Sequence, residues 1–127
     1  MKVLLSIKPV FANKIFEGTK RFEFRKSIFK KQVTTVVVYA SAPLQQIIGE
    51  FEIEQILYLD LETLWSITHS DSGISKSFFY EYFEDKERGY AIQIKNTKLY
   101  EVPKNLKETY NMFPPQSFAY IKPLELS

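Results

Sequence analysis

The chain turns at Gly18-Thr19-Lys20-Arg21-Phe22-Glu23-Phe24-Arg25, where a glycine precedes a short run of alternating charged and aromatic side chains. Glycine takes the left-handed conformation that ends many helices without steric cost, so Gly18 predicts the end of a helix. Successive side chains of a strand point to opposite faces. Arg21, Glu23 and Arg25 would therefore share one face, and the rings of Phe22 and Phe24 would share the other. We therefore expect the two rings to anchor this strand on a core and the charges to lie on its other face.

The residues before this stretch predict a buried strand and then the helix that Gly18 ends. Val3–Ile7 is an apolar run bounded by lysines, which is typical of a buried strand. Pro9 suits the first turn of a helix, because the amide hydrogen that it lacks would have no partner there. The apolar residues of this helix share one side: Phe11, Ala12, Ile15 and Phe16.

The rest of the chain predicts four more strands and a helical pair. The strands are indicated by β-branched or alternating apolar residues at Val33–Tyr39, Gln46–Leu57, Tyr90–Tyr100 and Ser117–Lys122. The helical pair is expected at about residues 60–86, with Asp60 as the N-cap of its first helix. The second helix would bury one face, made by Ile74, Phe78, Phe79, Tyr82 and Phe83.

This order of elements favours an α+β fold. Six strands that do not alternate with helices as βαβ units disfavour a doubly wound parallel sheet. We expect a small mixed β-barrel or a strongly curved sheet, with one N-terminal helix and the inserted helical pair outside it.

Length and composition indicate one globular domain over residues 1–127. The 127 residues are 45% hydrophobic and 16% aromatic, which suits a single core. Cysteine is absent, which excludes disulfide scaffolds, cysteine nucleophiles and thiolate metal sites. The first apolar run is too short for a signal peptide or a membrane span, so we expect a cytoplasmic protein that does not contact membranes.

Charge is distributed unevenly along the chain. Residues 1–31 hold nine Lys and Arg against Glu17 and Glu23, giving +7, whereas residues 50–87 hold ten acids against Lys76 and Lys86, giving −8. An anionic ligand with one docking face would be steered by such a local potential. An ordinary solvated surface whose two halves partly neutralise each other explains the pattern equally well.

Lys20, Glu23 and Arg25 are the side chains best suited to chemistry. A carboxylate between two cations this close stays ionised at neutral pH. Two interpretations stay open at this point. One is an ion-pair ladder on a surface strand, which contributes little stability. The other is a site for a charged ligand.

The spacing Gly18-x-Lys20-x-x-Glu23-x-Arg25 resembles the G-x-K-x-x-E-x-R signature of the ASCH domain family, a branch of the PUA-like superfamily. Four fixed positions in eight would match in a chain of this length by chance on the order of once in a thousand. Other stretches are similar to a bacterial and phage subgroup of small ASCH proteins: Ser6-Ile7-Lys8-Pro9, Tyr39-Ala40-Ser41-Ala42-Pro43, Ile48-Gly49-Glu50 and Pro114-Pro115-Gln116-Ser117-Phe118.

The resemblance implies a PUA-like mixed β-barrel with a cleft beside the motif. ASCH domains are generally proposed to bind RNA or other nucleic acid in that cleft, in translation-linked or transcription-linked roles. We therefore expect RNA or a nucleotide as ligand, no cofactor, and phosphate contacts from Lys20 and Arg25. The expected ligand-binding residues are Lys8, Lys20, Glu23, Arg25, Ser41, Gln116 and Ser117.

The resemblance leaves open whether the protein is an enzyme. In the acetylcytidine amidohydrolases of this family, a lysine, a threonine and an acid of the inserted segment hydrolyse an amide on a modified nucleoside. Lys20 matches the lysine, but Glu23 stands where the threonine would be. A ribonuclease is also implied, because a lysine with a glutamate would serve in-line attack by a 2′-hydroxyl. Either hydrolase would use Lys20 and Glu23, with Asp71 from the turn between the inserted helices as a third candidate.

Other candidate residues are less specific. His69 is the single histidine, so no metal site is predicted around it. The row Glu50, Glu52 and Glu54 would suit a hard cation, but a solvated strand face is the favoured interpretation for at least two of them. The acidic exterior of the inserted pair favours a solvated face, with a protein-docking surface as the alternative. Base stacking would be open to five aromatic residues: Tyr39, Tyr90, Tyr100, Phe113 and Tyr120.

Overall fold

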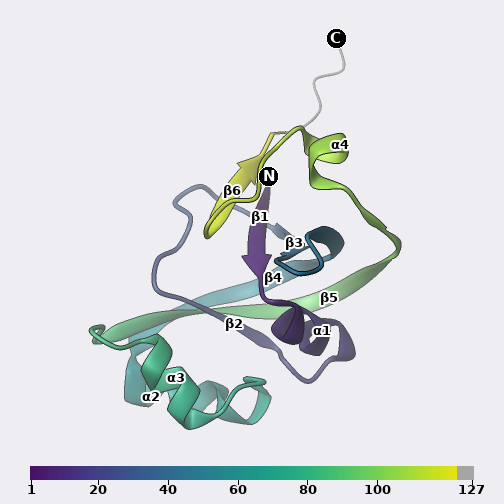
Figure 1. Ribbon diagram of the computed structural model, residues 1–127. Helices are drawn as coiled ribbons and strands as arrows, with labels where there is room; N and C mark the ends of the chain where they lie inside the picture. Colours follow the sequence, from purple (N-terminus) through teal and green to yellow (C-terminus); the bar gives the residue numbers. More distant parts are fainter. Residues whose placement is uncertain (123–127) are drawn as a thin grey trace.

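The computed structural model describes residues 1–122, so the last five residues of the domain predicted for 1–127 lie outside the described part. Figure 1 shows one sheet with helices at its ends and sides. The strands are β1 (Lys2–Ile7), β2 (Phe22–Arg25), β3 (Thr35–Ala40), β4 (Gln46–Asp60), β5 (Arg88–Lys104) and β6 (Phe118–Ile121). The helices are α1 (Pro9–Glu17), α2 (Leu61–Thr68), α3 (Lys76–Tyr82) and α4 (Leu106–Tyr110), with a 3-10 turn η1 (His69–Asp71) after α2.

The six strands form a mixed sheet in the order β2-β5-β4-β3-β1-β6. β1 pairs in parallel with β3, and the other neighbours are antiparallel. The predicted α+β class and strand number are confirmed. The closed barrel is corrected, because no ladder within residues 1–122 joins the edge strands β2 and β6. The sheet is nevertheless curved enough for Arg25 of β2 to contact Ser117, which precedes β6.

The turn at Gly18 forms as the sequence predicts. Gly18 has a φ of 90°, and its amide donates to the carbonyls of Lys14 and Ile15 at the end of α1. After this turn, Phe22 and Phe24 are buried against Leu64 and other apolar residues of the insert. The two rings therefore anchor β2 on a core, as expected.

The charged face of β2 lies inside the curved sheet. Glu23 is paired with Ile92 of β5, and directly paired residues point to the same face of a sheet. Ile92 is fully buried in the main core, which β1, β3, β4, β5 and α1 enclose. Glu23 therefore points toward the interior, at a position where the core is not filled because the sheet is open between β2 and β6.

The inserted helical pair lies between β4 and β5, and Figure 1 shows it at one end of these long strands. Its second helix, α3, does not bury one continuous face. Phe79 and Phe83 enter the core against Phe24, whereas Phe78 is 36% exposed. Among residues 1–122, no helix is long and apolar enough to cross a membrane.

Two features of the fold differ from the sequence prediction. The structure adds the short helix α4 in a segment for which no helix or strand was predicted, and Leu106 of α4 packs on Leu4 and Val37 across the sheet. The strands β4 and β5 are also longer than predicted: their pairing continues to Asp60 and Arg88 at the insert, and at the other end β5 runs on to Lys104, which pairs with Ile47.

Candidate functional site

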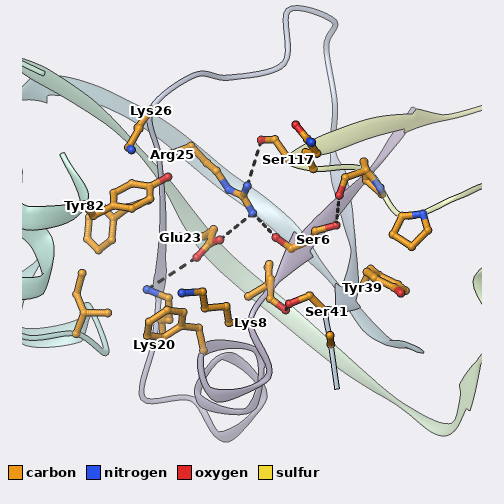
Figure 2. A pocket seen from close by; sticks show the side chains of 18 of the residues that line it. Ser6, Lys8, Lys20, Glu23, Arg25, Lys26, Tyr39, Ser41, Tyr82 and Ser117 are labelled. Atoms are coloured by element: carbon orange, nitrogen blue, oxygen red, sulfur yellow. Dashed lines mark hydrogen bonds and ion pairs between the residues drawn. The ribbon is translucent and has the colours of Figure 1, made fainter. Parts of the chain in front are cut away.

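A cavity of about 620 Å³ opens where the sheet is not closed, between β2 and the segment that leads into β6. Figure 2 shows the motif residues in the middle of this cavity. All seven predicted ligand-binding residues line it: Lys8, Lys20, Glu23, Arg25, Ser41, Gln116 and Ser117. The cavity also contains residues not predicted for the site, among them Ser6, Phe11, Lys26, Ile74, Phe78 and Tyr82. Four cations and one carboxylate therefore converge on one concave surface.

Lys20 is the most deeply placed of these charges, with 2% of its surface exposed. Its Nζ donates to the carbonyl of Ser72 over 2.8 Å and lies 3.9 Å from Oε1 of Glu23. The rings of Phe11 and Phe24 lie 5.5 and 5.0 Å from the same nitrogen. Burial lowers the pKa of Lys20 below its usual value, and the neighbouring Glu23 carboxylate opposes this shift.

The turn after η1 fixes the position of Lys20 through three consecutive carbonyls. The carbonyl of Asp71 accepts from the Arg21 amide over 2.7 Å, and that of Gly73 accepts from Lys14 Nζ over 2.9 Å. The carbonyl of Ser72 between them accepts from Lys20. Gly73 has a φ of 70°, and a Cβ built there would lie 2.7 Å from Cβ of Lys20. Only glycine therefore fits this turn at its present distance from Lys20.

Glu23 links the two motif cations. Its side chain is 10% exposed, and Oε2 accepts from Nη2 of Arg25 over 3.0 Å. The other carboxylate oxygen, Oε1, faces the Lys20 ammonium at 3.9 Å. Glu23 is thus a buried acceptor with one oxygen engaged by arginine and the other close to a lysine.

Arg25 bridges the two edges of the sheet. Nη2 donates to the carbonyl of Ser6 in β1 over 3.0 Å as well as to Glu23, and Nη1 donates to Oγ of Ser117 over 3.3 Å. Its Nε is buried without a hydrogen-bond partner among residues 1–122. The planar guanidinium matches several acceptors at once, which a lysine ammonium does not. Much of Arg25 is therefore committed to holding the cavity together.

The remaining predicted residues form the polar side of the cavity. Lys8 and Gln116 are exposed at its mouth, and Ser41 and Ser117 are half-buried. Figure 2 shows Ser6, Ser41 and Ser117 on the side of the motif opposite Tyr82. Of the five aromatic residues considered for base stacking, Tyr39 alone lines this cavity, and burial raises its pKa.

The opposite side of the cavity comes from the inserted segment and was not predicted. Phe78 and Tyr82 are spaced by four residues and share one face of α3, and Ile74 lies just before this helix; all three line the cavity. Lys26 lies at the end of this wall, with Nζ 4.9 Å from the centre of the Tyr82 ring. The spacing of four residues was visible in the sequence, but Phe79 and Phe83 repeat it one position later and mask it.

Three other sequence candidates lie outside this cavity. Asp71 contributes its backbone carbonyl to Arg21 and has an exposed side chain, so its catalytic role stays a prediction without a cavity contact. His69 is exposed, with Nδ1 on the carbonyls of Trp65 and Ser66. The glutamate row is dispersed, because each member has a different partner: Tyr100 and Lys2 for Glu50, Asn96 for Glu52, and Lys95 for Glu54.

Comparisons with known proteins agree with this architecture. Crystal structures of the ASCH protein from Zymomonas mobilis superpose with a TM-score of 0.88 at 31% identity, covering 95% of this chain and 87% of that one. A curated relative from the same organism, named ASCH domain-containing ribonuclease, is 30% identical over 95% of this chain and 84% of its own length. The N-terminal domain of Staphylothermus marinus McrB shares the fold, with a TM-score of 0.55 at 14% identity over 96% of this chain and 88% of its own.

Two longer relatives contain a similar segment. The large ribosomal subunit protein uL22 and the ATP synthase subunit alpha of Ureaplasma parvum are each 31% identical to this chain over 94% of its length. The chain spans 39% of the first protein and 15% of the second. The family model of the ASCH domain matches residues 5–110, which include every element from α1 to α4. This chain therefore belongs to the ASCH domain family.

Proposed function

We propose that this protein binds RNA by taking an unpaired nucleotide into the cavity. The observation that carries the proposal is the convergence of four cations on one concave surface of about 620 Å³. This volume lies within the range of roughly 300–1,000 Å³ that is typical of small-ligand sites. The name of the Zymomonas mobilis relative, a ribonuclease, supports RNA as the polymer. A role in translation-linked or transcription-linked RNA handling in the cytoplasm is part of the same proposal.

The four cations would have different roles, depending on how deeply each lies in the cavity. Lys8 and Lys26 are exposed, so they meet the phosphates of an incoming strand. Lys20 and Arg25 lie deeper, where low solvent exposure strengthens each hydrogen bond to an anionic or polar group. An ammonium has three donors; one of Lys20 is on Ser72 and the Glu23 carboxylate lies 3.9 Å away, which leaves a donor for a ligand.

A second candidate function is RNA cleavage, which the Lys20–Glu23 pair favours. Glu23 would accept the proton of a 2′-hydroxyl while that oxygen attacks the adjacent phosphorus. The bond from phosphorus to the 5′-oxygen then breaks, and the leaving oxygen takes a proton from the Lys20 ammonium, whose lowered pKa makes it a better acid. The products are a 2′,3′-cyclic phosphate and a free 5′-hydroxyl, so DNA would bind without being cut.

Binding is tested by titrating salt against labelled single-stranded RNA and DNA of equal length. For two or three phosphate contacts we expect the logarithm of affinity to fall with the logarithm of salt concentration at a slope of about −1.4 to −2.1. Lys26→Ala lowers the magnitude of this slope by about 0.7, whereas Lys76→Ala, on the exposed surface and outside the cavity, leaves it unchanged. Binding that does not respond to salt, or is absent from the wild type, contradicts the proposal.

Cleavage is tested separately on the same RNA. Glu23→Gln keeps the shape of the side chain and removes its basicity, so we expect RNA binding to persist and cleavage to fall by about 100-fold or more. Cleavage that survives this substitution would exclude Glu23 as the base. Acetylcytidine is the parallel substrate, since its hydrolysis by the wild type and not by Glu23→Gln would favour the amidohydrolase alternative instead.

A further inference from the structure

We propose that the inserted helix α3 supplies the binding surface for the nucleobase, with Phe78 as the main contact. This inference rests on the proposed function, because it assigns the base-binding half of the same cavity. It also gives the insert a role that its sequence, read as a core helix with an acidic exterior, does not indicate.

The three faces of α3 have different neighbours. Phe79 and Phe83 are 0% and 1% exposed in the core beneath the sheet. Tyr80 is 38% exposed and does not line the cavity. Phe78 lines the cavity and stays 36% exposed, so the core is complete without all of its ring. A large ring that is left partly bare in a cavity is available to a ligand.

The position of Phe78 is fixed from both sides. Oγ of Ser75 accepts from the Phe78 amide over 3.1 Å, which caps α3 at this residue. The ring packs edge-on against Phe11 of α1, with 5.3 Å between ring centres and 65° between planes. A ring held in this way meets an incoming base with little loss of side-chain entropy.

Charge is separated across the cavity in the way a nucleotide requires. The wall made by Ile74, Phe78 and Tyr82 carries no charged group, and aromatic faces of this kind stack with any base. At the end of the wall, Lys26 lies over the Tyr82 ring. An exposed cation at this position would contact the phosphate of a nucleotide whose base lies against the wall. The uncharged aromatic wall therefore complements a base, and the adjacent Lys26 complements the anionic backbone to which that base is joined.

The alternative is that Phe78 serves only to pack against Phe11, and the two explanations differ in a measurable way. A short single-stranded RNA and an abasic ribose-phosphate oligomer of the same length carry equal charge, so their difference in affinity reports the bases alone. We expect the wild type to bind the RNA about tenfold or more tightly than the abasic oligomer. Phe78→Ala removes this preference, Phe78→Tyr restores it, and Tyr80→Ala leaves it intact. Lys26→Ala weakens both oligomers by the same factor.

The outcomes separate this inference from the proposed function. Equal affinity of the wild type for both oligomers, or a preference that survives Phe78→Ala, contradicts base binding by Phe78 but leaves the proposal of RNA binding in place. Failure of the wild type to bind either oligomer overturns both. Thermal unfolding of each variant accompanies the titrations, and Phe78→Leu, which keeps an apolar side chain without a ring, replaces Phe78→Ala if the alanine variant does not fold.

Discussion

At the scale of single residues, Lys20 is a charged side chain that is buried at the expense of stability and lies in the candidate site. An ammonium group 2% exposed has lost most of its hydration and keeps one carbonyl, one carboxylate at 3.9 Å and two aromatic rings as neighbours. Burial is the larger of the influences on its pKa, which is lowered. Such a residue destabilises the protonated folded state, and this is typical of residues kept for chemistry or binding.

The lowered pKa of Lys20 predicts a particular dependence of stability on pH. The folded state binds fewer protons than the unfolded state between the lowered pKa and the ordinary value of 10.5, so the Lys20 contribution to the free energy of unfolding rises with pH in that window. We therefore expect the wild type to gain stability relative to Lys20→Met as the pH approaches 10.5. Urea unfolding of both proteins at several pH values measures this, with the exposed Lys76→Met as control. A gain in the opposite direction would show that the fold favours the charged lysine.

Some residues of the candidate site could be predicted from the local sequence, whereas others depend on contacts between segments far apart in the chain. Lys20, Glu23 and Arg25 were predictable, because alternation along one strand and a local motif place them together. Phe78 and Tyr82 were not, because their exposure depends on how α3 is oriented against β2, and periodicity alone assigns every apolar residue of a short helix to the core. Lys26 was not predicted for the site either, because the local pattern does not show that it lies beside Tyr82.

At the scale of elements, the insert positions the site by its backbone. Three consecutive carbonyls of residues 71–73 accept from Arg21, Lys20 and Lys14, so the turn is attached to the connection between α1 and β2. The sequence predicted the two inserted helices but not this attachment, which depends on backbone groups. It also missed α4, whose five residues are too few to show a helical period, although Asn105 caps it through the Glu108 amide.

Gly73 and Gly18 offer a matched comparison of this attachment. Both have positive φ, so alanine costs about 1–2 kcal/mol at each position. At Gly18 a Cβ meets nothing within 4 Å, whereas at Gly73 it would lie 3.3 Å from the Cα of Lys20 and closer still to its side chain. We expect Gly73→Ala to be the more destabilising by roughly 1–3 kcal/mol in urea unfolding and to weaken RNA binding, which Gly18→Ala preserves. Equal losses at both positions would mean that the turn moves freely away from Lys20.

At the scale of the whole molecule, the site exists because the sheet does not close. β2 and β6 are its edges, and the strands between them are curved so that residues near these edges approach each other. Strand number and order of elements are encoded by local patterns, and they were predictable. Closure depends on whether two distant edges share hydrogen bonds, which no local pattern reports. In place of a backbone ladder at this opening, the motif arginine connects β2 to β1 and to the segment before β6.

This arrangement predicts that Arg25 stabilises the whole fold in addition to shaping the cavity. Arg25→Ala removes three hydrogen bonds and leaves Glu23, which is 10% exposed, without its closest cation. We expect a loss of about 3–5 kcal/mol in the free energy of unfolding, and a smaller loss for Arg25→Lys, since one ammonium does not reach acceptors on both edges. Arg21→Ala, at an exposed arginine that is not one of the four signature residues and whose backbone hydrogen bonds remain, should change stability by less than about 0.5 kcal/mol. If the two alanine variants unfold at the same urea concentration, the opening is held by the surrounding elements and not by Arg25, and the motif arginine is then free to serve the ligand alone.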